Sequence, residues 1–369
     1  MENENKMKSS NKISSYILVF FIGCLAMYAV VYFFPTSITE QVTKLEKDVT
    51  VTDTGIADAV EKVYHSVVVV STYAKEKNTA SGTGFVYSKE DGKYYLLTNY
   101  HVIKGGDKVT VMFTDGQVME AEIIGYNELA DIAVLAIETD KELSIAELGD
   151  NSKVRVGDTV FAVGSPLDSA YSWTVTRGIV SGKDRMVEVS VENSGSNDYI
   201  MKVLQTDTAI NSGNSGGVLC NSNGEVIGIT SLKLVSSGVE GMGFAIPIEK
   251  ALEKAQKIID NEVDEQPYLG VRMVDLTKGY LQYGRLIQES GLTSGVIIAS
   301  VEDKSPADKA GFEANDIITK IGNDTVTNIA YLRYYLYEYK VGDKVKIEVY
   351  RDGKSKTIEI TLGSNNKTS

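Results

Sequence analysis

The stretch Gly213-Asn214-Ser215-Gly216-Gly217 leads directly into the apolar run Val218-Leu219-Cys220. A serine between glycines, in a tight turn that feeds a strand, can hold its hydroxyl outward while nearby backbone N–H groups converge on one point. Acyl transfer needs this arrangement, but a plain Gly-rich surface loop has the same composition. The choice between the two depends on whether the chain also supplies a base and an orienting acid.

Short apolar runs separated by turn residues fill the region between residues 56 and 263. Runs of this length and spacing, with almost no helical periodicity between them, predict an all-β barrel or sandwich. The region is long enough for two barrels. The expected strands cover residues 66–71, 84–87, 94–97, 109–113, 131–137, 159–163, 186–191, 218–220 and 226–229.

A candidate base and a candidate acid precede the serine. His101 follows the run 94–100, where a strand would end and a short turn begin, whereas His65 has no polar partner nearby and is assigned no catalytic role. Asp131 lies in the apolar run 129–137, and a carboxylate in such a run requires a specific hydrogen-bonding partner. A lone His or Asp is often only structural, but together with Ser215 these residues supply a base, an acid and a nucleophile.

Signals of mixed structure characterise the C-terminal part of the chain. An amphipathic helix is expected over residues 248–262, followed by a linker at 264–267. Alternating apolar residues over 345–349 and 358–362, joined by Asp352-Gly353, predict a β-hairpin. Ser305 and Gly311 are expected to bound a short helix, and Thr327 to cap a second helix that runs to Tyr339.

An uninterrupted apolar stretch occupies residues 16–34, which contain no charge. As a helix it would span about 28 Å, close to the thickness of a bilayer core. Three lysines precede it, which predicts a cytoplasmic N-terminus and an exported remainder. A cleaved signal peptide is the alternative, but the stretch is longer than a usual signal-peptide core and no clear cleavage site follows it. We therefore expect a tail at 1–12, an uncleaved transmembrane anchor at 13–35 and a polar tether at 36–55.

The composition of the chain argues against some classes of binding partner. The net charge of -13 and the absence of a basic stripe argue against nucleic acid, whose binding sites concentrate Lys and Arg. The two cysteines lie in the predicted anchor (Cys24) and in a predicted core strand (Cys220), so neither a disulfide between them nor a metal site is expected. No cofactor is implied.

Several segments together closely resemble the HtrA (Deg) family of trypsin-like serine proteases. They are TNYHVI at 98–103, DIAVL at 131–135, TDTAIN at 206–211, GNSGG at 213–217 and GFAIP at 243–247. The resemblance implies a chymotrypsin-like double β-barrel in which Ser215 attacks the scissile carbonyl and His101 transfers the proton. It further implies that Asp131 orients the imidazole and that the N–H groups of Gly213 and Ser215 form the oxyanion hole.

The resemblance also indicates the substrate pocket, at Ala209, Ile210, Asn211, Gly243 and Phe244. Trypsin-type enzymes that cut after Lys or Arg place an acid six residues before the serine, where this chain has Ala209. An uncharged and partly filled pocket predicts small or medium aliphatic residues, such as Val or Ala, before the cut.

The C-terminal unit, residues 268–363, resembles an HtrA-type PDZ domain of mixed α and β structure, followed by a tail at 364–369. SPADKAGF at 305–312 and NDIITKIGNDTV at 315–326 match, although Asn315 replaces the usual Gly. The carboxylate-binding loop would be Tyr268-Leu269-Gly270-Val271, which would receive the C-terminus of a peptide. A PDZ domain that only packs on the protease is the alternative.

Taken together, the sequence predicts a mainly β, membrane-anchored extracytoplasmic serine endopeptidase of protein quality control. Its expected substrates are unfolded or damaged exported proteins, and a short connection over residues 73–84 favours, by resemblance, a membrane-tethered homotrimer. Two alternatives stay open. One is a proteolytically inactive peptide-binding chaperone or scaffold; the other is a signalling protease that cuts one specific membrane partner.

Overall fold

The computed structural model describes residues 18–29, 54–165, 172–189, 199–232, 241–262 and 265–364. The strands are β1 Val67–Ala74, β2 Lys77–Glu90, β3 Lys93–Thr98, β4 Lys108–Met112, β5 Val118–Asn127, β6 Ile132–Glu138, β7 Thr159–Gly164, β8 Thr174–Val189, β9 Tyr199–Thr206, β10 Val218–Asn221, β11 Val226–Thr230, β12 Gly243–Pro247, β13 Pro267–Tyr268, β14 Val271–Asp275, β15 Val296–Val301, β16 Ile317–Ile321, β17 Asp324–Thr325, β18 Lys344–Arg351, β19 Lys354–Thr361 and β20 Gly363–Ser364. Between residues 54 and 364, the described helices are α3 Thr54–Tyr64, α4 Tyr100–Ile103, α5 Ile248–Ile259, α6 Tyr280–Ser290, α7 Pro306–Ala310 and α8 Ile329–Leu336, with short 3₁₀ turns at Asn151–Lys153 and Leu276–Lys278.

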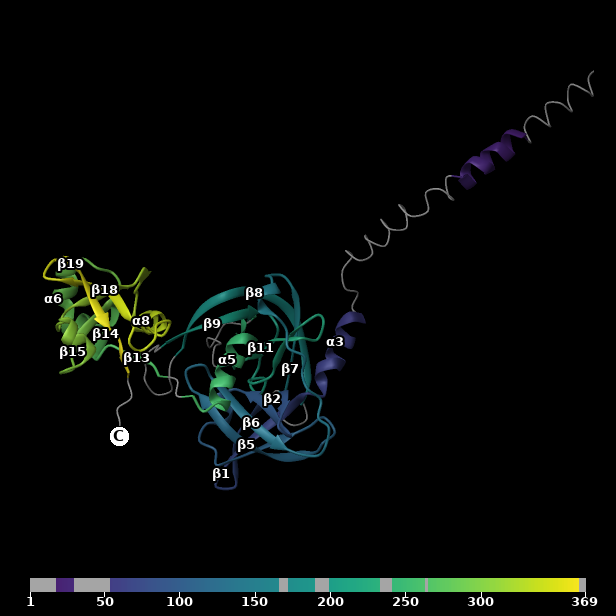
Figure 1. Cartoon of the computed structure of the whole chain (residues 1–369), viewed down its shortest axis with the longest axis horizontal. Helices are drawn as coiled ribbons and strands as arrows, with labels where there is room; N and C mark the ends of the chain where they lie inside the picture. Colours follow the sequence, from purple (N-terminus) through teal and green to yellow (C-terminus); the bar gives the residue numbers. More distant parts are fainter. Residues whose placement is uncertain are drawn as a thin grey trace, which may run out of the picture. The chain divides into compact units, whose positions relative to one another are not determined.

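Two closed antiparallel barrels form the first part of the folded chain (Figure 1). The first has the strand order β1-β2-β3-β6-β5-β4 and the second β10-β11-β12-β9-β8-β7. Because successive side chains of a strand point to opposite faces, β1 sends Val68 and Val70 into the first barrel and Val67 into the core cluster that also contains Phe161 and Val218 of the second barrel. The two barrels therefore share a core at their contact.

The C-terminal domain is built on the sheet β14-β15-β16-β18-β19, with β17 paired to β16. The predicted hairpin is present as β18 and β19, in which Val345, Ile347 and Val349 lie in the core. Ser305 caps α7 by accepting a hydrogen bond from the Asp308 N–H, and Gly311 closes it at φ +84°. The cap of α8 is Asn328 rather than Thr327, because the Asn328 side chain accepts from the Tyr331 N–H.

Other predicted boundaries differ in detail. The run 186–191 is not a separate strand but, over its described residues, the end of the long strand β8. Pro267, expected in the linker, and Ser364, expected in the tail, pair with each other as β13 and β20. The end of the expected tether begins α3, whose Ala59 and Val63 are buried in the core between the barrels.

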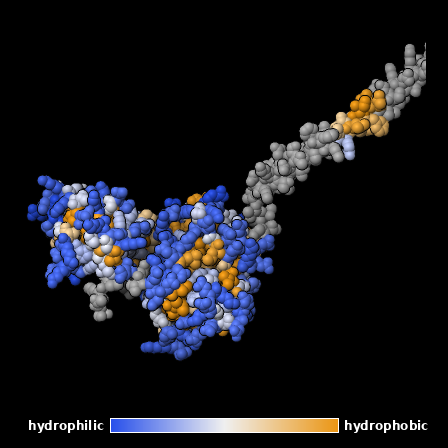
Figure 2. Space-filling model, in the orientation of Figure 1, coloured by the Kyte–Doolittle hydropathy of each residue, from blue (hydrophilic) through white to orange (hydrophobic). Residues whose placement is uncertain are grey.

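The N-terminal segment is described only over residues 18–29, which form a helix with exposed apolar side chains (Figure 2). The rest of the predicted anchor lies outside the described residues. Within the part of the chain that the structure describes, no helix is both long enough and apolar enough to cross a membrane.

Candidate active site

The loop of residues 211–217 carries the predicted nucleophile, Ser215, and is called the nucleophile loop below. It lies just before β10 and is shaped by two glycines. Gly213 and Gly216 have φ values of +98° and +83°, in the left-handed region that side chains disfavour. A Cβ on Gly216 would lie 2.0 Å from the carbonyl oxygen of Thr83 and 2.4 Å from Thr98 Oγ1. Gly216 therefore allows the nucleophile loop to touch the first barrel directly.

His101 lies in the short helix α4, which begins as β3 ends. Its Nδ1 is 2.9 Å from Asp131 Oδ2 and 3.0 Å from Oδ1, and its backbone N–H donates to Oδ1 at 3.0 Å. The carboxylate is buried, with a side-chain exposure of 1%, whereas the imidazole is 27% exposed. One edge of the ring is thus fixed by a buried acid, and the ring remains accessible.

Asp131 lies in the turn just before β6, not within the strand as the sequence pattern suggested. Its φ is +53°, and this backbone is held because the Asp131 carbonyl accepts from Asn99 Nδ2 at 2.9 Å and from the Tyr100 N–H at 3.2 Å. Besides His101, its carboxylate accepts from Ser231 Oγ at 3.0 Å. Several donors therefore compensate the buried charge, as the apolar sequence around it required.

Ser215 is buried and lies close to the elements that carry the other two residues. A Cβ on Gly82 would lie 2.7 Å from Val102, the neighbour of His101, and 3.0 Å from the Ser215 carbonyl oxygen. The Ser215 Oγ accepts from the Leu232 N–H at 3.0 Å, and among the described residues it forms no hydrogen bond with His101. The adjacent residues Ser231 and Leu232 therefore contact the predicted acid and the predicted nucleophile, and no motif in the sequence pointed to either.

The peptide planes around Ser215 are partly fixed. The Asn214 carbonyl accepts from Thr230 Oγ1 at 2.6 Å and from the Gly217 N–H at 2.9 Å. Because a trans peptide directs its N–H opposite to its carbonyl, these two bonds also fix the direction of the Ser215 N–H. Within the described parts of the chain, neither this N–H nor that of Gly213 donates a hydrogen bond.

The residues predicted for the substrate pocket gather on the second barrel. Ile210 is almost fully buried, and a Cβ on Gly243 would lie 2.8 Å from its Cγ1. Phe244 follows in β12, and the Ala209 carbonyl accepts from Thr176 Oγ1 at 3.1 Å. Asn211 is exposed, and its carbonyl accepts from the Asn214 N–H. Ile210 and Gly243 thus lie in direct contact, whereas Asn211 stays at the surface.

The predicted carboxylate-binding loop connects β13 and β14. Gly270 has φ +85°, and a Cβ there would lie 2.2 Å from the Ser305 Cβ, so the loop packs against the start of α7. The carbonyls of Leu269 and Gly270 accept from Ala307 and Glu302, whereas their N–H groups donate to no other described residue. Among the strands that the structure describes, β14 pairs with β15 alone, so its other edge can accept an added strand.

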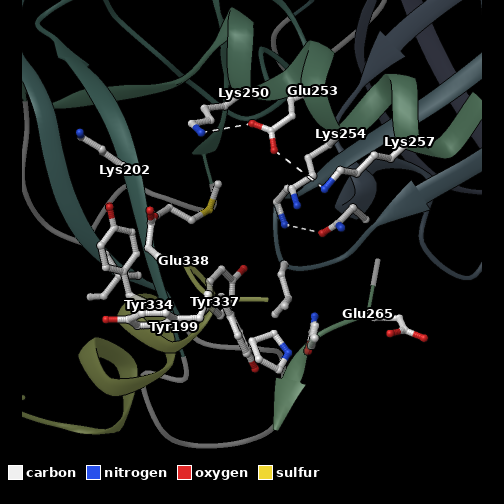
Figure 3. Close-up of a pocket in the computed structure, with 18 of the residues that line it drawn as sticks. Tyr199, Lys202, Lys250, Glu253, Lys254, Lys257, Glu265, Tyr334, Tyr337 and Glu338 are labelled. Atoms are coloured by element: carbon white, nitrogen blue, oxygen red, sulfur yellow. Dashed lines mark hydrogen bonds and ion pairs between the residues drawn. The ribbon is translucent and has the colours of Figure 1, made fainter. Parts of the chain in front are cut away.

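A separate cavity of about 770 Å³ lies beside α5, β9 and the C-terminal end of α8 (Figure 3). Lys250 and Glu253 form an ion pair of 3.2 Å on its α5 side, and Tyr334 and Tyr337 line the α8 side. None of His101, Asp131 and Ser215 lines it. Among the described residues, no group of three or more His, Cys, Asp or Glu side chains is placed to hold a metal ion.

A double β-barrel with a serine loop between glycines, followed by a PDZ-type sheet, defines a trypsin-like serine peptidase with a C-terminal PDZ domain. The trypsin-like peptidase domain family matches residues 82–229, and the PDZ domain family matches residues 267–362. The chain belongs to the HtrA/Deg family of serine endopeptidases, as two curated relatives and two solved structures indicate.

The serine protease Do-like HtrA of Lactococcus lactis (strain IL1403) is 38% identical over 340 residues, which cover 84% of this chain and 83% of that protein. The serine protease Do-like HtrB of Bacillus subtilis (strain 168) is 38% identical over 333 residues, covering 85% and 72%. A crystal structure of the serine endoprotease from Yersinia pestis superposes with a TM-score of 0.62 at 28% identity, over 86% of this chain and 100% of that one. The HtrA-type protease AlgW with a decapeptide gives a TM-score of 0.64 at 30% identity, over 84% and 98%.

Proposed function

We propose that the chain hydrolyses peptide bonds through Ser215, His101 and Asp131. The observation that carries this proposal is the paired contact of His101 Nδ1 with the buried Asp131 carboxylate, at 2.9 and 3.0 Å. With Nδ1 held as a donor, the other ring nitrogen, Nε2, is the free base that a nucleophilic serine needs.

In the proposed reaction, Ser215 Oγ attacks the scissile carbonyl and its proton passes to His101 Nε2. The imidazolium is stabilised by the Asp131 carboxylate and returns the proton to the leaving amine, which leaves an acyl-enzyme on Ser215. Water then hydrolyses the acyl-enzyme by the same steps. The N–H groups of Gly213 and Ser215 stabilise the tetrahedral oxyanion, and their lack of described protein partners supports this role.

The test compares the purified full chain with Ser215→Ala, His101→Ala and Asp131→Asn on a chemically unfolded protein, with and without peptides that carry free C-termini. A fluorophosphonate probe reports the nucleophile directly. We expect probe labelling and cleavage in the wild type and loss of both in Ser215→Ala. An intact wild type that neither cleaves nor labels, even with peptide, would instead support an inactive chaperone or scaffold.

For specificity, we propose cleavage after small or medium aliphatic residues such as Val and Ala. The buried Ile210 against Gly243 supports a pocket without a charge at its base. Profiling the cleavage products of an unfolded protein by mass spectrometry tests this, and predominant cleavage after Lys or Arg would contradict it.

For regulation, we propose that the loop 268–271 binds the C-termini of peptides, with the peptide added as a strand beside β14. The unpartnered N–H groups of Leu269 and Gly270 and the open edge of β14 support this. Isothermal titration with hexapeptides tests it, and each peptide is compared with its C-terminal amide, because the amide removes the charge that the loop would hold.

We further propose that residues 13–35 anchor the protein in the membrane and that its folded part is extracytoplasmic and trimeric. The uncharged apolar stretch and the lysines before it support the anchor. Extraction of membranes at alkaline pH, protease protection in spheroplasts and light scattering of the detergent-solubilised chain test these three points separately. Release of the full-length chain at alkaline pH would contradict the anchor. For an extracytoplasmic protease, we propose that the substrates are unfolded exported proteins. Trapping substrates with Ser215→Ala tests this, and recovery of a single protein would instead indicate one specific membrane partner.

A further inference from the structure

Thr83, in the middle of β2 of the first barrel, forms hydrogen bonds with two segments of the second barrel, the nucleophile loop and the residue that follows β7. Its side chain is fully buried, and its Oγ1 donates to the Gly213 carbonyl at 2.7 Å. The same oxygen accepts from the Ser165 N–H at 2.9 Å, just after β7. Its backbone N–H donates to the Ser215 carbonyl at 2.8 Å. One residue of the first barrel thus holds both sides of the nucleophile loop in the second.

The hydroxyl is matched to this position. A threonine hydroxyl has one proton to donate and lone pairs to accept, and here the proton goes to Gly213 while a lone pair receives Ser165. Replacement by an apolar side chain of the same shape would leave the half-buried Gly213 carbonyl and the buried Ser165 N–H without this partner.

The bond to Gly213 matters because the two N–H groups proposed for the oxyanion hole are fixed differently. The N–H of Ser215 belongs to a peptide whose carbonyl is held by Thr230 and Gly217. The N–H of Gly213 belongs to the peptide that joins it to Ser212, and no described residue bonds to that peptide. The contact from Thr83 is the one described hydrogen bond that the Gly213 N–H or carbonyl forms, and the peptide of that carbonyl is also held by its N–H, on Asn214, which donates to the Asn211 carbonyl. A glycine has many other backbone conformations available besides the φ of +98° found here, so the bond from Thr83 restricts the conformation of Gly213.

We propose that the Thr83 hydroxyl is the positioning group of the oxyanion hole, which fixes the Gly213 N–H in the direction that stabilises the tetrahedral intermediate. Thr83 does not touch the reacting atoms. It acts through Gly213, and this inference rests on the proposed catalytic role of Ser215.

The experiment compares the full-length wild type with Thr83→Val and Thr83→Ser, and uses Thr79→Val and Ser215→Ala as controls. Thr79 lies in the same strand and donates to the Thr72 carbonyl at 3.3 Å, so its valine variant removes a similar bond away from the site. Each protein is assayed with a fluorogenic peptide that has Val before the cut, and with a fluorophosphonate probe. The rate constant and the amplitude of labelling are both measured, because an irreversibly misfolded fraction lowers the amplitude and leaves the rate constant unchanged.

We expect Thr83→Val to lower kcat and the labelling rate constant by about 10- to 100-fold, below the loss typical of deleting an oxyanion donor outright, with KM changed less than about twofold. Thr83→Ser keeps the hydroxyl and is expected to stay within about threefold of the wild type, as is Thr79→Val. Equal rates in Thr83→Val and the wild type would overturn the inference alone, and so would equal losses in the valine and serine variants. A wild type whose activity survives in Ser215→Ala would overturn the proposed function itself.

Discussion

Replacing Gly216 by alanine tests how closely the nucleophile loop must approach the first barrel. The new Cβ would lie 2.0 Å from the Thr83 carbonyl oxygen and 2.4 Å from Thr98 Oγ1, far inside contact distance. Neither atom can move freely, because Thr98 Oγ1 donates to that same carbonyl at 2.7 Å. The φ of +83° adds about 1–2 kcal/mol for a residue with a Cβ, and forced repacking typically costs about 1–3 kcal/mol. We therefore expect a total loss of about 2–5 kcal/mol in the free energy of unfolding.

Gly116 provides a matched control for the part of the stability loss that comes from the positive φ alone. Its φ is +81°, almost the same as that of Gly216, but a Cβ there would meet no atom within 4 Å. Gly116→Ala is therefore expected to lose only about 1–2 kcal/mol. The difference between the two variants isolates the close approach to Thr83.

The assay is urea unfolding of the full chain followed by the fluorescence of Trp173, the one tryptophan of the sequence. Its indole Nε1 donates to the Val67 carbonyl at 3.0 Å, so the signal reports the barrels rather than the PDZ domain. Fluorophosphonate labelling of Ser215 is expected to slow by about 100-fold in Gly216→Ala, because displacement of a reacting group by about 1 Å has an effect of that size. Equal stability and equal labelling in Gly216→Ala and Gly116→Ala would refute the reasoning.

Three further predictions concern buried groups. Ser231→Ala removes a hydrogen bond to the buried Asp131 carboxylate and is expected to lower kcat by about 10-fold and the free energy of unfolding by about 1–3 kcal/mol, as peptide hydrolysis and urea titration would show. Burial raises the pKa of the Cys220 thiol, so in a Cys24→Ser background a disulfide reagent such as DTNB is expected to label the chain only after unfolding; labelling of the native protein would contradict the buried position. Burial also raises the pKa of Tyr87 to about 12, above its unfolded value of 10.0, so its contribution to stability is complete below pH 10 and is lost as the pH rises to about 12. Urea titrations of Tyr87→Phe are expected to show a smaller loss over this window than those of the wild type.

The spacing of apolar residues in the sequence predicted the strands of the barrels and the C-terminal hairpin, where this spacing is most regular. Each barrel strand anticipated from an apolar run overlaps a strand of the structure, and the C-terminal hairpin and the α7 cap are present. β5, β9 and β12 were not assigned as strands, because strand pairing across a barrel can recruit segments whose own pattern is weak. α3 was readable in principle, because Ile56, Ala59, Val60 and Val63 recur at helical spacing.

Only part of the candidate site could be predicted from the sequence. Asp131 was predicted because a carboxylate in an apolar run demands partners, whereas Ser215 and His101 were predicted from the Gly-rich motif, the scarcity of histidines and the family resemblance. Ser231, which donates to that carboxylate, and Asn99, which donates to the Asp131 backbone carbonyl, do not break any pattern. They are ordinary polar residues whose importance depends on contacts across many positions of sequence, and only the closed barrels bring them to Asp131.

The contacts around Ser215, the proposed nucleophile, fall into two groups: some hold its backbone and another orients its hydroxyl. Its carbonyl is tied to the first barrel through Thr83, and its N–H is directed by the bonds on Asn214, so the backbone is held from both sides. Its hydroxyl oxygen accepts from the Leu232 N–H, which occupies one of its two lone pairs, and among the described residues it forms no hydrogen bond with His101. Because Leu232 follows Ser231, which binds Asp131, a shift of this two-residue segment would alter the acid and the nucleophile together.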